Sequence, residues 1–236
     1  MPQDPLSFAV ILFELVVMAF ALSLHDMTQA WMANRLGDPT ARIDGRMTLN
    51  PMAHFDTWGM ALSPLLSIFI FHNRLPFGWS RPVPMTFRNF REKNGEMLAV
   101  CAGPVAQLLC AVVALIVLLI LRGHSPDAAR SLLLVKFVAL RAVPADGFGP
   151  LPSIFPVLLL LYLCIMMNLL LLCLNLLPMP FFDGGRILLH FLPYNAARAY
   201  ENYSNYFMIG FFLLAGPLVY LAFNPLIAIF DAFLFG

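Results

Sequence analysis

The stretch Phe20–Trp31, which reads FALSLHDMTQAW, decides how this chain folds, because it sets polar side chains near the end of a long apolar run. These polar residues are His25, Asp26, Thr28 and Gln29. An ionisable group inside a membrane helix is costly to desolvate, and such groups generally serve a function. We therefore expect a helix over this stretch, with a functional site near its end.

The composition is that of an integral membrane protein. The 236 residues are 61% hydrophobic and 11% charged, whereas an average soluble protein is about 25% charged. Crossing the hydrocarbon core takes about 20 apolar residues. The sequence therefore predicts an all-α polytopic helical bundle of about four full spans, formed by one domain over residues 1–236. The candidate spans are Ser7–Trp31, Met97–Leu121, Ile154–Leu177 and Asn205–Phe230.

Three further segments are expected to form shorter elements. The segment Leu36–Pro51 is rich in turn residues with short β-prone pieces between them, which predicts a small β-hairpin or sheet after the first helix. The apolar run Gly59–Phe71 is too short to cross and is flanked by basic segments, which favours a re-entrant element. The segment Ser131–Val143 is apolar but interrupted by charges, as in an amphipathic surface helix.

The distribution of charge predicts an orientation. The segments 32–96 and 178–204 hold ten of the fourteen Lys and Arg residues, and the loop 122–153 holds four. The positive-inside rule then places the amino terminus outside. The net charge is +1, and no basic cluster with interleaved aromatic residues indicates nucleic-acid binding. The lipid bilayer is therefore the first expected partner.

The polar stretch resembles a zinc-binding motif in its spacing. His25 and Gln29 are four residues apart and share a helix face, and Asp26 lies about 100° round from His25. This is the spacing of HExxH, in which two histidines bind zinc and the glutamate activates water. Here the motif reads HDMTQ. Gln29 thus replaces the second histidine, and Asp26 replaces the glutamate.

A second polar residue follows the third predicted span. The segment Asn175–Gly185 reads NLLPMPFFDGG, in which the prolines stop the helix and the glycines permit a tight turn. Asp183 then has two alternatives. It either caps a helix that begins at Gly184 or turns toward the first helix as a metal ligand.

Together these stretches resemble the site-2 proteases, which are intramembrane zinc metalloproteases, and in particular their small bacterial branch without a PDZ domain. The resemblance covers nearly the whole chain. It implies membrane-spanning protein segments as substrates or partners, and the bacterial cytoplasmic (inner) membrane as the location. The matching positions are 25–29, 37–41, 45–51, His54, 82–84, 102–104 and 175–185.

Carried over by position, the resemblance makes His25 the first zinc ligand, Asp183 the third and Asn175 the substrate-binding amide. Gln29 stands at the second ligand position, where an amide oxygen is a poor substitute for imidazole. Asp26 stands at the general-base position, and its shorter side chain withdraws the carboxylate by roughly 1.5 Å when ~1 Å already matters for rate. Zinc is therefore expected only if this altered site functions.

Another histidine and three hypotheses remain open. His54 is either a substitute for the missing imidazole or a hydrogen-bonded loop histidine. The leading hypothesis is a catalytically impaired homologue, a pseudoprotease that binds membrane helices. The alternative is an active zinc metalloendopeptidase that cleaves transmembrane segments with a variant metal site. The remote alternative is a transporter or channel, against which the absence of inverted repeats counts.

Overall fold

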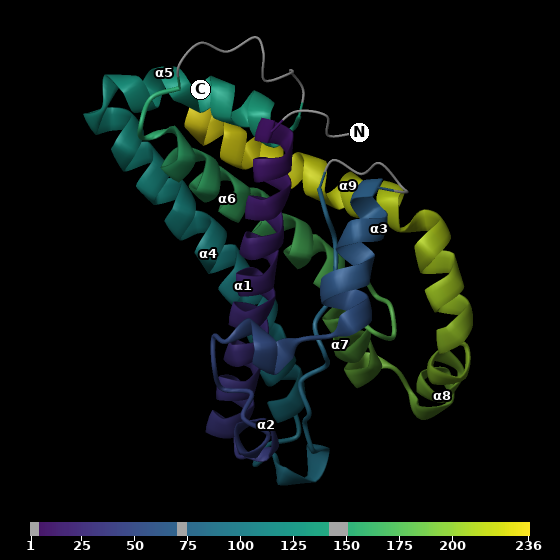
Figure 1. The fold of residues 1–236 in the computed structure, drawn as a ribbon. Helices are drawn as coiled ribbons and strands as arrows, with labels where there is room; N and C mark the ends of the chain where they lie inside the picture. The colour runs from purple at the N-terminus through teal and green to yellow at the C-terminus, as the bar shows by residue number, and fades with distance from the viewer. Residues whose placement is uncertain (1–4, 70–74, 142–150) are drawn as a thin grey trace.

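The computed structural model describes residues 5–69, 75–141 and 151–236, and over these ranges it is helical with no β-strand (Figure 1). Figure 1 shows the start of α1 and α5 at one end of the molecule, with α2, α7 and α8 toward the other. The α-helices are α1 (Pro5–Arg35), α2 (Thr40–Ile43), α3 (Ser63–Phe69), α4 (Gly95–His124), α5 (Pro126–Ala139), α6 (Phe155–Asn175), α7 (Asp183–Phe191), α8 (Tyr194–Asn202) and α9 (Ser204–Phe235).

Among the described residues, three helices are long and apolar enough to cross a membrane, namely α1, α4 and α6. They pack on one another, and α6 is the most buried of the three. They match the first three predicted spans. The fourth predicted span, Asn205–Phe230, falls within α9, whose segment Leu221–Phe235 is apolar but shorter than a span.

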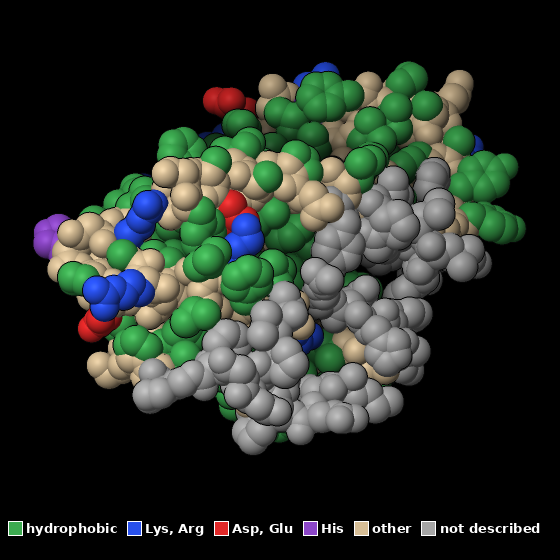
Figure 2. All heavy atoms as spheres, turned by 90° about the horizontal axis from the view of Figure 1, so that it is seen from above, with side chains coloured by type: hydrophobic (Ala, Val, Ile, Leu, Met, Phe, Trp, Pro, Cys, Tyr) green, Lys and Arg blue, Asp and Glu red, His purple; other side chains and the backbone are tan. Residues whose placement is uncertain are grey.

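The outer surfaces of α1 and α4 are apolar. On α1, an exposed stripe repeats every fourth residue and consists of Phe8, Leu12, Val16 and Phe20. Residues at this spacing share one helix face. In the view of Figure 2, hydrophobic side chains are spread over the described part of the surface, with charged side chains between them. An exposed apolar surface of this kind is suited to contact with lipid.

The predicted β-hairpin after the first helix is wrong. The two turn signals are present, since Gly37 and Gly45 have positive φ angles of 113° and 73°. Between them, however, the chain forms the helical turn α2, because the Asp38 carboxylate accepts a hydrogen bond from the backbone N–H of Thr40 at 3.1 Å. Local side-chain hydrogen bonds of this kind to the backbone compete with strand formation.

Asp38 also ties this turn to the segment before α4. Its carboxylate accepts hydrogen bonds from the backbone N–H of Thr86 at 2.7 Å and the side-chain amide of Asn89 at 2.9 Å. Burial alone would raise the pKa of Asp38, but the hydrogen bonds from Thr40, Asn89 and Thr86 hold it below its ordinary value. The turn is thus built around an ionised, buried carboxylate.

The apolar run after this turn forms a short helix, and its predicted re-entrant position stays a prediction. It consists of a π-helical turn, Thr57–Leu62, followed by α3, and residues 70 and 71 of the predicted run lie outside the described residues. A Cβ atom on Gly59 would lie 2.1 Å from the carbonyl oxygen of Trp79. This close approach lets the segment that contains Trp79 and Ser80 pass between the turn and α1.

The predicted surface helix is present as α5 and begins five residues earlier than Ser131, at Pro126. The hydroxyl of Ser125 caps it by accepting a hydrogen bond from the backbone N–H of Ala128 at 3.2 Å. Residues 142 and 143 of the predicted segment lie outside the described residues. The helix packs against α4 and α6 and also contacts α1.

Candidate functional site

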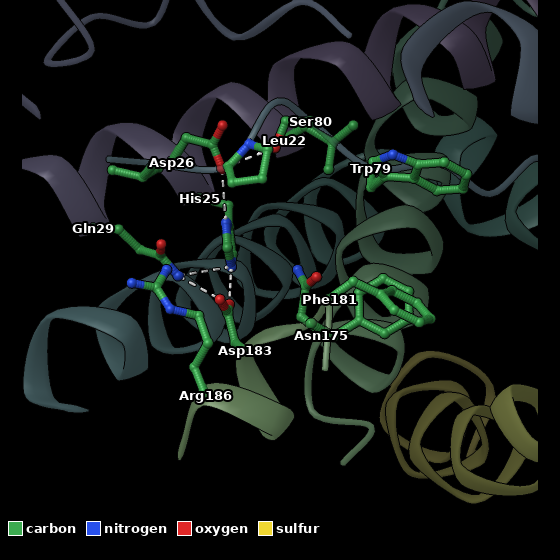
Figure 3. A pocket seen from close by; sticks show the side chains of 13 residues that line it. Leu22, His25, Asp26, Gln29, Trp79, Ser80, Asn175, Phe181, Asp183 and Arg186 are labelled. Atoms are coloured by element: carbon green, nitrogen blue, oxygen red, sulfur yellow. Dashed lines mark hydrogen bonds and ion pairs between the residues drawn. The ribbon is translucent and has the colours of Figure 1, made fainter. Parts of the chain in front are cut away.

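The site lies where the last turns of α1 meet the first turn of α7. Helix α1 places His25, Asp26 and Gln29 there, and each is at most 5% exposed. Asp183 opens α7, and Asn175 closes α6. All five line one small cavity of about 60 Å³ (Figure 3). The folding of the chain therefore gathers residues that lie about 150 positions apart in sequence, since Gln29 and Asp183 are separated by 154 residues.

The three ligand positions are in direct contact. The Nε2 atom of His25 lies 2.7 Å from Oδ2 of Asp183, and the side-chain nitrogen of Gln29 lies 2.9 Å from the same oxygen. Asp183 makes no capping hydrogen bond at the start of α7. Its carboxylate instead turns toward α1 and contacts His25 and Gln29, which excludes the capping alternative and leaves metal binding untested.

The orientation of the Gln29 amide is fixed by its neighbours. Its nitrogen donates a hydrogen bond at 3.0 Å to the backbone carbonyl of Val100 on α4. A carbonyl oxygen only accepts, so the NH₂ group must face Val100 and Asp183. At the second ligand position the site therefore presents hydrogen-bond donors, which have no lone pair for a metal ion.

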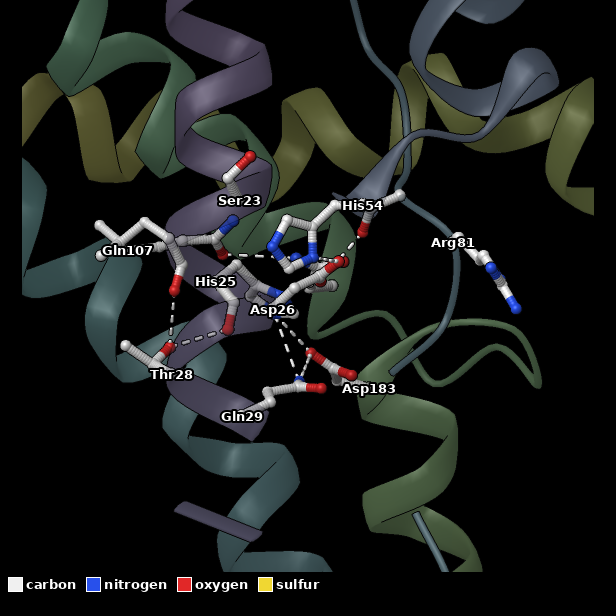
Figure 4. A network of polar contacts seen from close by, with 12 residues as sticks. Ser23, His25, Asp26, Thr28, Gln29, His54, Arg81, Gln107 and Asp183 are labelled. Carbon is white, nitrogen blue, oxygen red and sulfur yellow. Dashed lines mark hydrogen bonds and ion pairs between the residues drawn. The ribbon is translucent and has the colours of Figure 1, made fainter. Parts of the chain in front are cut away.

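Asp26 lies on the other side of the His25 ring (Figure 4). Its Oδ1 is 3.2 Å from Nδ1 of His25 and accepts a hydrogen bond from the Ser80 hydroxyl at 2.9 Å. Its Oδ2 is 3.1 Å from Nδ1 of His54 and 3.4 Å from the guanidinium of Arg46. The Asp26 carboxylate is thus held by His25 of α1 and by Ser80, His54 and Arg46, which come from other segments.

His54 contacts Asp26 at the general-base position rather than the ligand positions His25, Gln29 and Asp183. Its Nδ1 faces Asp26, and its Nε2 lies 2.8 Å from the backbone carbonyl of Thr48. Because that carbonyl only accepts, Nε2 carries a proton. Both ring nitrogens are therefore engaged, and in this arrangement His54 is the hydrogen-bonded loop histidine of the two alternatives.

The family model described as peptidase family M50 matches residues 13–217, which is most of the chain. This chain belongs to peptidase family M50, the family of the site-2 proteases. A protein of Bacillus subtilis (strain 168) named "Putative zinc metalloprotease YwhC" is 29% identical over 211 residues, which cover 89% of this chain and 82% of that protein. No solved structure matches the chain.

The residues of this M50 protein do not fit a zinc ion at the ligand positions. Protein zinc sites use imidazole nitrogen, thiolate or carboxylate, with three or four such ligands. Over the described parts of the chain, no group of three or more His, Cys, Asp and Glu is arranged to hold a metal. His25 and Asp183 supply two ligands of the right type, and the NH₂ group of Gln29 occupies the place of the next.

Gly103 of α4 makes room for the His25 ring. A Cβ atom at Gly103 would lie 2.3 Å from Nε2 of His25 and 2.7 Å from Cε1. No real Cβ approaches a ring so closely, so only glycine permits this ring position. The glycine of the Ala102–Pro104 motif is thereby explained, because the His25 imidazole packs directly against the backbone of α4 at Gly103.

We expect Gly103→Ala to lower the free energy of unfolding by about 1–3 kcal/mol, the usual cost of overpacking a dense site. Gly123→Ala is the matched control, because Gly123 lies on the same helix and a Cβ there meets nothing within 4 Å. Helix propensity alone makes alanine more stable than glycine in either place. Thermal unfolding of both variants in one detergent measures the difference, and equal stability of the two would contradict the packing of His25 on Gly103.

Two further residues of the site escaped prediction from sequence. Arg46 is only 1% exposed and joins the carboxylate of Asp26 to the loop before the 3-10 turn Pro51–His54. Ser80 donates to the same carboxylate from the segment before Pro82. Each lies within or beside a matching motif, which is the signal that could have drawn attention to them.

Proposed function

We propose that this M50 protein is impaired in peptide hydrolysis and acts by binding membrane-spanning protein segments in the bacterial cytoplasmic membrane. The observation that carries this proposal is the Gln29 amide, whose donors face Val100 and Asp183 where a second imidazole would be needed. Hydrogen bonds of His25 and Gln29 to Asp183 hold the ligand positions together as a closed polar cluster.

The substrate-binding side of the site is retained, which supports binding as the remaining activity. Asn175 lines the cavity beside Phe181 and Asp183 (Figure 3). Its amide nitrogen lies 3.4 Å from the side-chain oxygen of Gln107 on α4, and the nitrogen of Gln107 is buried with no partner among the described residues. Buried amide donors of this kind suit the backbone carbonyls of a bound segment whose helix is locally opened.

We expect the purified protein in nanodiscs to bind a fluorescently labelled single-span peptide, and Asn175→Ala to weaken that binding about 3- to 10-fold, as loss of one hydrogen bond predicts. Asn168→Ala is the matched control. Asn168 is buried on the same helix, and its amide nitrogen bonds within α6 to the carbonyl of Cys164. No binding of any single-span peptide, or equal effects of the two variants, would contradict the proposal.

A second candidate is an active zinc metalloendopeptidase with a variant metal site. The name of the 29% identical Bacillus subtilis protein favours it. It predicts one equivalent of zinc in the purified, unmodified protein and cleavage of the bound peptide. The binding experiment separates the two candidates when the peptide is examined for cleavage after incubation with zinc.

A further inference from the structure

The Asp26 carboxylate is held on the side of the His25 ring that faces away from Gln29 and Asp183. Its Oδ1 lies against Nδ1 of His25, whereas Nε2 of the same ring points to Asp183 (Figure 4). From this geometry we propose that Asp26 is a positioning residue, which fixes the His25 imidazole through its Nδ1 atom. Asp26 does so although it stands at the sequence position where the family carries its general base. The inference rests on the proposed function, because it explains further why hydrolysis is impaired.

The first argument is that the carboxylate has no free acceptor site. An ionised carboxylate offers about four lone-pair sites on its two oxygens. In Asp26, His25 and Ser80 occupy Oδ1. On the other oxygen, Oδ2, the contacts come from His54 and Arg46. A general base needs a free site within about 2.6–3.2 Å of the proton that it removes, and here each site is already directed at a protein group.

The second argument is that the partners of Asp26 are themselves fixed. Arg46 donates at 2.8 Å to the backbone carbonyl of Ala53 and also donates to that of Arg81. His54 is completely buried and bonds through its other nitrogen to the carbonyl of Thr48. Because the backbone carbonyls of Thr48, Ala53 and Arg81 hold these side chains, the carboxylate cannot turn toward the ligand positions without breaking several buried hydrogen bonds.

The third argument concerns what such a carboxylate does for a histidine. A carboxylate that accepts a hydrogen bond from one ring nitrogen fixes the tautomer and the orientation of the ring, and so directs the other nitrogen. Asp26 contacts Nδ1, which leaves Nε2 to face Asp183 at 2.7 Å. The side chain at the base position therefore controls where the His25 nitrogen points.

The test separates positioning from base catalysis by measuring metal affinity. We use Gln29→His as background and Co²⁺ alone as the probe, with its visible absorption as the signal. Adding Asp26→Asn should weaken Co²⁺ binding 10- to 100-fold, the usual effect of losing a carboxylate behind a metal-binding histidine. A residue that served only as base would leave the affinity unchanged, and that result would overturn the proposal.

Asp38→Asn in the same background is the matched control. Asp38 is also a fully buried carboxylate bonded to a threonine and an asparagine, but it does not contact the site. It should leave Co²⁺ affinity unchanged, and an equal loss in both variants would overturn the specific role of Asp26.

A second measurement needs neither metal nor the Gln29→His background. In the unmodified protein with ¹⁵N-labelled histidine, the His25 Nδ1 resonance, identified by its loss in His25→Gln, should carry a hydrogen-bonded proton and should shift in Ser80→Ala and in Asp26→Asn. A resonance that neither variant moves would overturn the proposal. Failure of the protein to bind any membrane peptide would refute the proposed function while leaving this resonance in place, so the two failures are distinguishable.

Discussion

Gln29→His is expected to bind one equivalent of zinc tightly enough to survive purification. The Gln29 nitrogen already lies 2.9 Å from Oδ2 of Asp183 and 3.5 Å from Nε2 of His25. An imidazole at position 29 should therefore place a ring nitrogen close to both of these atoms. Three ligands of the types that zinc prefers would then converge, and the fourth position would remain open for water. Metal analysis of the purified variant measures the gain.

Thr28→His is the matched control for this gain, because it adds an imidazole one residue away. The Thr28 hydroxyl bonds to the carbonyls of Leu24 and His25 along α1 and makes no contact with Asp183. Its imidazole should therefore bring no zinc into the site. Zinc in the Thr28→His variant at the same level, or its absence from Gln29→His, would mean that the ligand positions do not converge as described.

The double variant Gln29→His, Asp26→Glu is expected to turn over a membrane-spanning substrate at least tenfold faster than Gln29→His at saturating zinc. General bases usually contribute about 10²–10⁴-fold. The extra methylene moves the carboxylate by roughly 1.5 Å, beyond the position that Ser80 and His54 fix for Asp26, and ~1 Å of misplacement can cost ~100-fold in rate.

Cleavage is measured with both variants loaded with zinc, so that a change in metal affinity does not enter the comparison. Asp26→Asn in the Gln29→His background supplies the lower limit, since an amide cannot act as a base. If the double variant cleaves no faster than this amide variant, the cavity around Phe181 and Phe182 has changed in a way that the HDMTQ motif alone does not describe.

The helical spans were predictable because hydrophobic length alone specifies them. The runs that begin at Ser7, Met97 and Ile154 each became part of a helix long and apolar enough to cross a membrane, as expected where lipid leaves backbone groups no other partners. The hairpin was not predictable, because both turns are present at Gly37 and Gly45, and the hydrogen bond of the Asp38 carboxylate to the Thr40 backbone favours the helical turn over a strand.

The ligand positions of the site were predictable from the sequence, whereas Arg46, Ser80 and the geometry of the site were not. Motif positions alone identified His25, Gln29 and Asp183, and the structure brings them into contact. The contacts of Arg46 and His54 with Asp26 depend on how the loop after α2 folds over α1, which spacing along the chain does not specify. Sequence therefore indicates which residues meet, while the direction of each carboxylate follows from tertiary packing.

The central claim is that the unmodified protein has lost efficient hydrolysis, and its zinc content together with its cleavage of a bound peptide tests this claim most directly. The protein is purified from zinc-supplemented cells, analysed for metal, and incubated with a single-span peptide in nanodiscs. The Gln29 donors and the two remaining ligands predict far less than one zinc per chain and no efficient cleavage. Stoichiometric zinc with efficient cleavage would contradict the account and establish the variant-site protease in its place.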